Sequence, residues 1–350
     1  MIAVIYGTRP EIIKLSPIIR MAVAQKRELV TIHTGQHFSQ NMNDVFFENL
    51  ELPSPDYELN VGSKSHAEMV AEALVGIERI LLKHKPSIVL VQGDTNSALA
   101  GALTAAKLGI KVGHIEAGLR SFDRRMPEEL NRVLIDHMSD LLFAPTQTSY
   151  NYLLTEGISK DKIKIVGNTI ADALKYGLKK SSKITLPPYI SPKQYFLATL
   201  HRQENVDDPK TLKQMISNFQ RIVKDTSTTL VLPLHPRTKQ LLNKHAIDTT
   251  GLSLIEPQDY FNFLALLNNA RMVFTDSGGI QEEACILGIP CITLRDNTER
   301  PETVELGSNF LVGSDLNRMV SAISYFEKHH GGWKQPYGEG DTAERIISSL

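Results

Sequence analysis

Short runs of β-branched and other apolar residues alternate with longer amphipathic stretches along the whole chain. In the first half the apolar runs cover residues 2–6, 29–34, 87–92, 110–115, 141–144 and 162–166. Stretches with a helical period lie between them, for example residues 66–83 and 99–108. Strands that read as almost continuously apolar are buried on both faces, and strands that alternate with helices form parallel sheets. The pattern therefore predicts repeated βαβ units.

This alternation is interrupted once, by the segment SSKITLPPYISPK at residues 181–193, which contains three prolines and has no clear period. Such a segment is typical of a linker. Apolar runs then resume at residues 195–200, 229–234, 252–255, 271–275 and 290–294. A chain of 350 residues is long enough for two domains. We expect an α/β protein with two doubly wound, Rossmann-like domains that face a shared cleft.

Composition narrows the class of protein. The formal net charge is −1, which argues against general binding to nucleic acid or to a membrane surface. No run approaches the length of a membrane span, and the N-terminus lacks a signal-peptide pattern, so we expect a cytoplasmic protein. Cys285 and Cys291 lie in an apolar stretch and are expected to be buried, reduced thiols. The sequence has no HExxH or paired CxxC spacing, so no metal site is predicted.

Cations and a glycine follow the first strand, in GTRPEIIKL. Gly7 frees the turn, Arg9 and Lys14 add positive charge, and Pro10 suits the first turn of a helix. A helix N-terminus with added cations is an anion site, although a plain strand–turn–helix with solvated side chains fits the same residues.

Three carboxylates lie near the ends of the next elements. Asp94 follows the strand at 87–92, Glu116 follows the strand at 110–115, and Glu128 begins the helix after Pro127. Asp94 and Glu128 also suit helix capping or the positive end of a helix. Asp94 and Glu116, however, end adjacent elements of one βαβ unit, so we expect them at the same edge of the sheet.

The second half carries a pattern suited to a nucleotide. In TDSGGIQEEACILG, Ser277, Gly278 and Gly279 form a turn between a strand and a helix, where backbone N–H groups can bind a diphosphate. Glu283, one turn into the helix, is placed to bind a ribose diol.

Basic residues follow other strands of the same half. His201 and Arg202 lie in LHRQEN and suit phosphate binding or proton transfer, while His235 and Arg300 occupy two further loops. A structural role is an alternative for each of them.

Taken in order, these motifs resemble one known family. GTRPEIIKLSP, HTGQHFSQNM, VQGDTNSALA, HIEAGLRSFDRRMPEELNR, VGNTIADAL, HRQEN, TDSGGIQEEA and TERPE occur as in the non-hydrolysing UDP-N-acetylglucosamine 2-epimerases, and the likeness runs from residue 1 to about 313. The resemblance implies a fold similar to the glycosyltransferase-B enzymes. It implies an N-terminal domain at residues 1–168, a UDP-binding domain at 169–333, and a C-terminal helix at about 334–350 that packs back on the first domain.

The resemblance also implies a reaction. UDP-GlcNAc and UDP-ManNAc, precursors of cell-surface polysaccharides, would interconvert by elimination of UDP to 2-acetamidoglucal and re-addition, without a cofactor. The catalytic set would be Asp94, Glu116, Glu128 and His201, and which carboxylate is base or acid stays open. The substrate-binding set would be Arg9, Lys14, His235, Phe263, Ser277, Gly278, Gly279, Glu283 and Arg300. A homodimer is implied, as is an activator site for a second UDP-GlcNAc that includes Gln36, His37, Gln40 and Arg202. The loop SFDRRMPEE departs from the longer, Trp-containing version of bacterial members, which bears on activator dependence. At least one arginine of this loop is expected to be merely solvated.

Other functions fit parts of the pattern. A relative of the same fold could epimerise a modified UDP-sugar such as UDP-diacetamido-glucuronate, for which an extra basic contact to the sugar carboxylate would be needed. A glycosyltransferase has less need for three carboxylates together. A hydrolysing epimerase would release free ManNAc, and a non-catalytic UDP-sugar binder would bind UDP without turnover.

Overall fold

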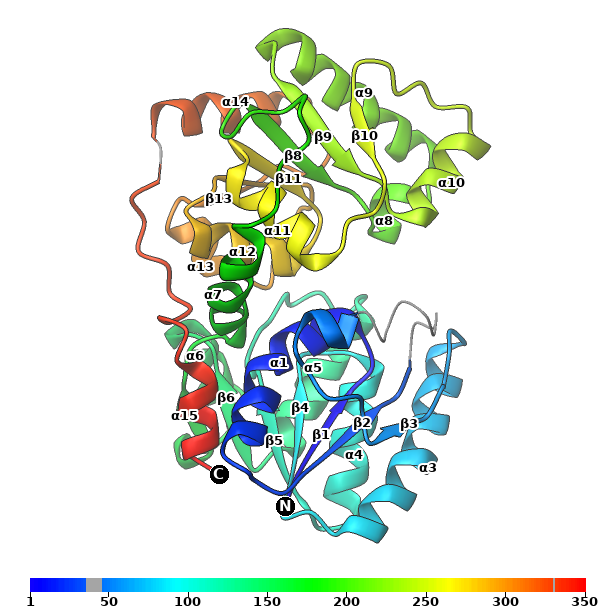
Figure 1. Cartoon of the computed structure of the whole chain (residues 1–350), viewed down its shortest axis with the longest axis vertical. Coiled ribbons are helices and arrows are strands. Elements are labelled where there is room, and N and C mark those ends of the chain that lie inside the picture. The colour runs from blue at the N-terminus through cyan, green and yellow to red at the C-terminus, as the bar shows by residue number, and fades with distance from the viewer. Residues whose placement is uncertain (36–45, 330) are drawn as a thin grey trace. The chain divides into compact units, whose positions relative to one another are not determined.

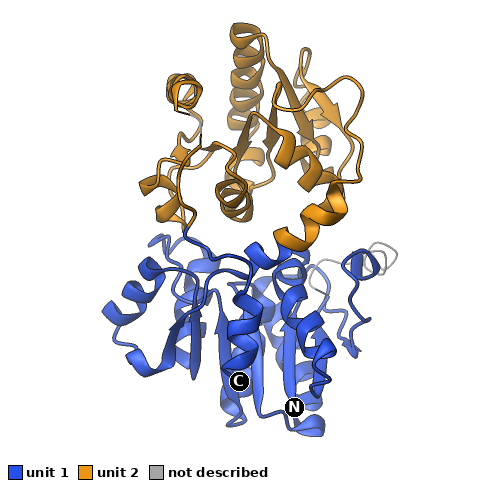
Figure 2. Ribbon diagram, turned by 60° about the vertical axis from the view of Figure 1, so that its left-hand side comes forward, with its two compact units in different colours: residues 1–173, 336–350 blue, residues 174–335 orange. Residues whose placement is uncertain are grey.

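The computed structural model describes residues 1–35, 46–329 and 331–350 of the chain (Figure 1). The described part divides into two units, which Figure 2 colours separately. Unit 1 comprises residues 1–173 and 336–350, and unit 2 comprises residues 174–335. The chain passes from unit 1 to unit 2 within a helix, so the proline-containing segment 181–193 belongs to unit 2 in this division.

Unit 1 is built on a parallel sheet that has seven strands in the described residues. They are β1 (Ile2–Tyr6), β2 (Leu29–His33), β3 (Tyr57–Glu58), β4 (Ile88–Gln92), β5 (Lys111–Ile115), β6 (Leu141–Ala144) and β7 (Ile163–Ile165). Their order in the sheet is β3-β2-β1-β4-β5-β6-β7. The helices are α1 (Arg9–Ala24), α3 (His66–His84), α4 (Asn96–Lys107), α5 (Pro127–Met138), α6 (Gln147–Thr155), the 3₁₀ helix η1 (Lys160–Lys162) and α15 (Thr342–Ser348). α7 (Thr169–Ser181) spans the division between the units.

Unit 2 repeats this architecture with six parallel strands among the described residues. They are β8 (Tyr195–Thr199), β9 (Thr229–Pro233), β10 (Ser253–Ile255), β11 (Met272–Thr275), β12 (Cys291–Thr293) and β13 (Asn309–Leu311), in the order β10-β9-β8-β11-β12-β13. The helices are α8 (Gln203–Val206), α9 (Pro209–Thr226), α10 (Pro236–Lys244), α11 (Tyr260–Asn269), α12 (Gly278–Leu287), α13 (Pro301–Glu305) and α14 (Leu316–Lys328).

Both faces of the sheet in unit 2 are covered, as the continuous apolar runs predict. Phe196 of β8 and Phe274 of β11 belong to one hydrophobic cluster, whereas their sequence neighbours Tyr195 and Val273 belong to another. Successive strand residues point to opposite faces, so each β-strand contributes to two cores. The predicted fold class, two doubly wound α/β units, is confirmed.

Each predicted apolar run coincides with a strand to within two residues at either end, but two strands were not predicted. β3 contains only Tyr57 and Glu58, and β13 contains only Asn309, Phe310 and Leu311. Both are edge strands, and runs this short carry no readable period.

The C-terminal segment returns to unit 1, where α15 packs beside α1 (Figure 1). Asp172 of α7 accepts the backbone N–H groups of Thr342 and Ala343, at 3.2 and 3.0 Å, so it binds the N-terminus of α15 from outside that helix. The orphan donors of the first turn are satisfied in this way.

Candidate active site

Both sheets reverse their strand order at one point, between β1 and β4 in unit 1 and between β8 and β11 in unit 2. In open α/β sheets, ligands bind beyond the carboxyl ends of the strands at such a switch point. Asp94 lies just beyond β4, and His201 just beyond β8. Asp94 and His201 therefore lie at the edge of their own sheets where ligands of such folds bind.

The turn after β1 is fixed by a buried capping box. Glu11 accepts the N–H groups of Gly7 and Thr8, at 3.0 and 2.8 Å, and the Thr95 hydroxyl at 2.7 Å. A Cβ atom on Gly7 would lie 2.0 Å from Oγ of Ser97, so the close approach of the two loops requires glycine. Burial raises the pKa of Glu11 to about 7, against these hydrogen bonds, which lower it. Glu11 thus ties the β1–α1 turn to the β4–α4 turn.

Arg9 is the first residue of α1, and its side chain is exposed. Its guanidinium carbon lies 5.8 Å from the centre of the Phe46 ring, within the range of a cation–π contact. An exposed cation beside a helix N-terminus favours binding of an anion at this position.

Glu116 is buried at the end of β5 and has an unusual backbone, with φ of 71°. This left-handed conformation is rare for a residue other than glycine and persists where surrounding contacts impose it. Lys14 Nζ donates to Oε1 of Glu116 and Gln92 Nε2 donates to Oε2, both in short contacts. Asn168 Nδ2 also donates to Oε1, at 3.2 Å. Hydrogen bonds of this kind favour the ionised carboxylate.

Lys14 and Glu116 had been predicted as site residues, but Gln92 and Asn168 had not. Both lie inside the motifs quoted above, at or just after a strand end. Their position in the sequence could have indicated a role at the site. Their amide side chains carry no charge, however, so they were not selected as candidate catalytic groups.

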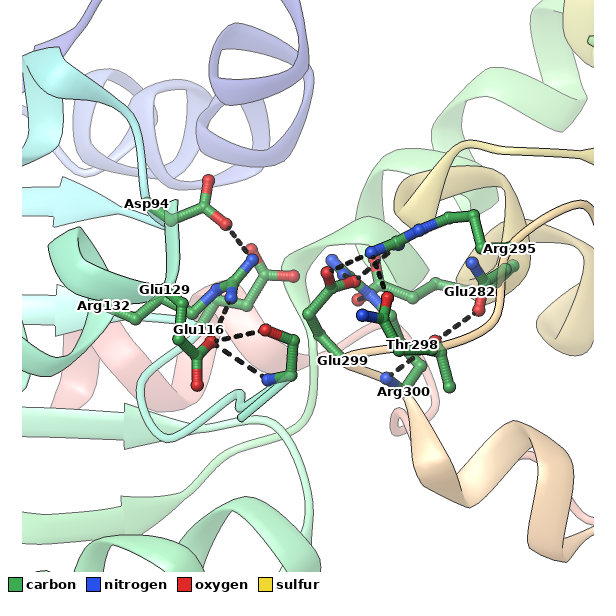
Figure 3. A network of polar contacts seen from close by, with 12 residues as sticks. Asp94, Glu116, Glu129, Arg132, Glu282, Arg295, Thr298, Glu299 and Arg300 are labelled. Carbon is green, nitrogen blue, oxygen red and sulfur yellow. Dashed lines mark hydrogen bonds and ion pairs between the residues drawn. The ribbon is translucent and has the colours of Figure 1, made fainter. Parts of the chain in front are cut away.

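Asp94 is held by an arginine from α5 (Figure 3). Arg132 Nη2 donates to Oδ2 of Asp94 at 2.6 Å, and its Nη1 donates to Glu129 at 2.5 Å. Arg132 and Glu129 are buried, whereas the Asp94 side chain remains partly exposed. The carboxylate of Asp94 is therefore oriented on one side and open on the other.

The two neighbouring acids of α5 have different environments. Glu129 also accepts the N–H groups of Ser121 and Phe122, at 3.0 and 2.9 Å, and so anchors the loop before the helix. Glu128 is half-buried, and its side chain makes no hydrogen bond or ion pair with another residue of the described part. In the same loop the Arg125 side chain is 90% exposed and forms an ion pair with Asp123, at 2.7 Å.

In unit 2, His201 contacts a carboxylate that the sequence analysis missed. Its Nδ1 lies 2.8 Å from Oδ1 of Asp276, while Oδ2 of Asp276 accepts the N–H groups of His201 and Arg202, both at 2.9 Å. Burial alone would raise the pKa of Asp276, but His201 and these donors hold it below its ordinary value. The His201 ring is 43% exposed, so its other nitrogen can reach a ligand.

The turn from β11 to α12 contains the residues predicted as backbone donors, but the N–H of Ser277 already donates to the Thr275 hydroxyl at 3.0 Å. Ser277 precedes α12, Gly278 and Gly279 begin it, and Glu283 is buried one turn later. A Cβ atom on Gly278 would lie 2.5 Å from Nη1 of Arg300, whereas one on Gly279 would meet nothing closer than 4.0 Å. Gly278 therefore allows the arginine to approach, and Gly279 leaves the outer side of the turn open.

Arg300 is buried behind this turn with its guanidinium paired (Figure 3). Its Nε donates to Glu282 at 2.9 Å and its Nη1 donates to Glu299 at 2.8 Å. Arg295 donates to both oxygens of Glu299, at 3.1 and 2.8 Å. Two cations and two carboxylates thus neutralise each other beneath the turn, and they fix its shape.

The two remaining predicted residues of unit 2, His235 and Phe263, differ in exposure. His235 is exposed at the start of α10, and its ring centre lies 6.5 Å from that of His201. Phe263 is half-buried on α11 against the core of unit 2.

The predicted activator site lies mostly outside the described residues. Gln36, His37 and Gln40 of the predicted activator site lie outside the described residues, and Arg202, the fourth member, donates from Nε to the backbone oxygen of Asp276 at 3.0 Å. No group of three or more His, Cys, Asp or Glu residues in the described ranges is arranged to hold a metal ion. In the same ranges, no helix is both long and apolar enough to cross a membrane.

Comparison with known proteins gives consistent matches over the full chain. A family model described as UDP-N-acetylglucosamine 2-epimerase matches residues 21–350. The UDP-N-acetylglucosamine 2-epimerase of Methanococcus maripaludis is 50% identical over 357 residues, which cover 99% of this chain and 97% of that protein. The UDP-2,3-diacetamido-2,3-dideoxy-D-glucuronate 2-epimerase of Pseudomonas aeruginosa is 42% identical, with coverage of 100% and 99%.

Structural similarity is equally extensive. The crystal structure of Methanocaldococcus jannaschii UDP-GlcNAc 2-epimerase, in complex with UDP-GlcNAc and UDP, matches with a TM-score of 0.93 at 49% identity. The match covers 100% of this chain and 99% of that one.

Proposed function

Because the chain belongs to the UDP-N-acetylglucosamine 2-epimerase family, we propose that it interconverts UDP-GlcNAc and UDP-ManNAc by inverting C2 of the sugar. One observation carries the proposal. Glu116, in a left-handed backbone conformation, is held as a carboxylate by Lys14 at the switch point of unit 1, where Asp94 is oriented by Arg132. Two oriented carboxylates suit proton removal and proton return at one carbon.

The reaction would proceed by elimination and re-addition. A carboxylate takes the C2 proton as the C1–O bond breaks, UDP leaves with the bonding electron pair, and 2-acetamidoglucal remains. UDP then adds back to C1 while C2 receives a proton on the other face. Atoms and oxidation state are conserved, so the chemistry requires neither a redox cofactor nor a metal. Departure of a stabilised diphosphate compensates for the weak acidity of the C2 proton, and exclusion of water keeps the glycal and UDP together.

The residues of unit 1 would act on the sugar and its leaving group. Asp94, Glu116 and Glu128 provide the acid and base groups, and Arg9 faces the departing negative charge. The contact of Lys14 with Glu116 supports a role for Lys14 in holding that carboxylate ionised.

The residues of unit 2 would bind UDP. Gly278 and Gly279 supply N–H donors and a helix N-terminus for the diphosphate. Ser277, whose own N–H donates to the Thr275 hydroxyl, offers its side-chain hydroxyl to the diphosphate, and Glu283 binds the ribose. His201 stabilises the leaving phosphate. His235 and Phe263 line the same site, whereas the buried ion pairs of Arg300 favour a supporting role behind Gly278.

The test is NMR of the purified protein with UDP-GlcNAc in deuterated water and no acceptor. UDP-ManNAc carrying deuterium at C2 is expected. Free ManNAc and UDP would indicate a hydrolysing enzyme, and UDP binding without any new signal would contradict the proposed substrate.

A second candidate is C2 epimerisation of a diacetamido-glucuronate nucleotide. The 42% identical Pseudomonas aeruginosa protein carries that activity in its name and is matched over its full length. The same NMR experiment, run with the two nucleotide sugars in parallel, ranks them by the rate of deuterium incorporation.

We also propose that the protein is a cytoplasmic homodimer with a second UDP-GlcNAc as activator. The cytoplasmic location is supported by the two cysteines, which are free and buried, as is typical of a reducing compartment. The homodimer is supported by α5, where Leu130 and Leu134 are 40% and 51% exposed. Leu134→Glu should give a monomer in light scattering.

Activation by a second UDP-GlcNAc should appear as a sigmoidal dependence of the rate on the UDP-GlcNAc concentration. A hyperbolic dependence would contradict the activator site.

A further inference from the structure

His114 is a fully buried histidine for which the proposed reaction has no direct use. It lies on β5, two residues before Glu116, and its side chain is 0% exposed. Its Nδ1 lies 2.6 Å from Oδ1 of Asp136 on α5, and its Nε2 lies 2.8 Å from the backbone oxygen of Gly93, in the turn after β4. One ring therefore connects three elements of unit 1.

Both ring nitrogens have fixed partners. A backbone oxygen can only accept, so Nε2 carries a proton and donates to Gly93. Asp136, which contacts Nδ1, also lies 2.8 Å from Nη2 of Arg120 and accepts the N–H of Gly118 at 3.2 Å. Burial by itself raises the pKa of Asp136, but His114 and Arg120 hold it below its ordinary value.

The carboxylate beside His114 is itself held. Asp136 pairs with Arg120, and Arg120 in turn donates to both oxygens of Glu156, at 2.7 and 2.5 Å. A buried ion remains ionised only if it is paired and hydrogen-bonded in this way.

The network holds the backbone on either side of the two candidate catalytic carboxylates. Gly93, which precedes Asp94, donates its N–H to the Ile115 oxygen at 3.0 Å, and its own oxygen accepts from His114, so the peptide units on both sides of Gly93 are held. Gly118, two residues after Glu116, is held by Asp136. It has φ of 82°, and a Cβ atom there would lie 2.5 Å from a backbone oxygen, so this turn also requires glycine.

We propose that His114 is a positioning residue: through its contacts with Asp136 and Gly93, it acts with Arg120 to fix the backbone that carries Asp94 and Glu116. The inference rests on the proposed function, because it takes these two carboxylates to be the groups that act on the sugar. Their placement matters because a displacement of about 1 Å can lower a rate by about 100-fold.

The contacts of the ring are tested on the wild-type protein, without a variant that might misfold. Ring-¹⁵N-labelled histidine should show one buried Nε2–H, bonded to the Gly93 oxygen, that is protected from exchange with solvent. Loss of this signal in His114→Gln assigns it. Asp136→Asn, which removes the anion but keeps the shape of the side chain, should shift this signal and provides the assignment if His114→Gln does not fold. A wild-type His114 ring whose N–H exchanges freely with solvent would overturn the proposal.

The positioning role is tested by kinetics. His114→Gln should lower kcat by about 10- to 100-fold, with KM and UDP affinity changed by no more than about two-fold. His137→Gln is the matched control. His137 is exposed on α5, and among the described residues its ring bonds only to the backbone oxygen of Val133. A His114→Gln protein with wild-type kcat would rule out positioning. If wild-type protein itself failed to epimerise, the proposed function would fail, while the NMR result would still decide the state of the network.

Discussion

At the scale of single residues, the two carboxylates at the sheet edge of unit 1 differ in the number of their hydrogen-bond donors and in their exposure. Glu116 accepts hydrogen bonds from three side chains, whereas Asp94 is oriented by one arginine and stays partly exposed. The several donors around Glu116 fix the position of its carboxylate. The partly exposed carboxylate of Asp94 can contact a ligand.

Removing either carboxylate without changing its shape should stop the chemistry. We expect Glu116→Gln and Asp94→Asn each to lower kcat by at least about 100-fold, because general acid–base groups contribute this much. UDP affinity should be unchanged, as measured by calorimetry. Asp161→Asn on the exposed helix η1 is the control for loss of a negative charge. A variant that keeps more than about a tenth of the activity would remove its residue from the catalytic set.

Glu11 predicts a pH dependence of stability. Its folded pKa of about 7 lies above the unfolded value of about 4.3, so the native state binds more protons between these limits. Its contribution to stability is therefore complete below about pH 4 and is lost as the pH rises through about 7, a change on the order of 3 kcal/mol.

Denaturant unfolding of Glu11→Gln should reveal this contribution. Glutamine cannot ionise, so the variant should gain stability relative to wild type as the pH rises from about 5 to 8. Glu68→Gln is the matched control, because Glu68 occupies the same position in the exposed capping box of α3. A pH-independent difference between Glu11→Gln and wild type would contradict the assignment.

At the scale of the element, α5 is the part of unit 1 that organises the site. Glu129, Arg132 and Asp136 are spaced three and four residues apart, so they lie on one helical face. That face is buried and binds the Asp94 side chain, the loop before the helix, and His114. Leu130 and Leu134, on another face, are exposed.

Arg132 should be the most sensitive position of this helix. Arg132→Met leaves the buried Glu129 without its cation, which should lower the free energy of unfolding by about 3–5 kcal/mol and frees Asp94 from its partner. Activity should fall more than the folded fraction does. Arg125→Met, which removes an exposed ion pair of the same loop, should change neither quantity measurably. Equal effects of the two substitutions on Tm and kcat would refute the organising role of α5.

At the scale of the whole molecule, the described residues divide the proposed work between the two units. The carboxylates belong to unit 1, and the proposed donors for the diphosphate and the ribose belong to unit 2. The net charge of −1 means that affinity for an anionic nucleotide must come from local features such as helix N-termini, not from the overall field.

Thermal unfolding with UDP should separate the two sets. UDP at about 100 times its Kd stabilises a binding protein by about 2.7 kcal/mol, which raises Tm. Glu283→Ala should lose most of this shift, whereas Asp94→Asn should keep it. Glu305→Ala, at an exposed position of α13, serves as the control in unit 2. An unchanged shift in Glu283→Ala would count against the ribose assignment.

Much of this organisation could be predicted from local sequence. The strands, their parallel arrangement and the strand-end positions of Asp94 and Glu116 all follow from the alternation of apolar and amphipathic stretches. The turn at Ser277 follows from residues that are neighbours in the sequence, whereas the N-cap of α4 is Thr95 and not Asp94. Edge strands of two or three residues, such as β3, gave no usable pattern.

The partners of the site residues could not be predicted in this way. Lys14 and Glu116 are 102 residues apart in the chain, and Arg132 reaches Asp94 across 38 residues. His114 read as an ordinary residue of a buried strand, and Asp136 and Asp276 as ordinary acids. Only the packing of α5 on β5, and of β8 beside β11, gives these side chains their contacts.

The sequence by itself thus determined the elements, the two parallel sheets and the chemical identity of the groups at their edges, because periodicity and turn chemistry depend on residues close together in the chain. The tertiary structure decided which of those groups are paired, buried or left open. These properties arise from contacts between elements, which depend on sheet order and helix packing, and no local pattern specifies them.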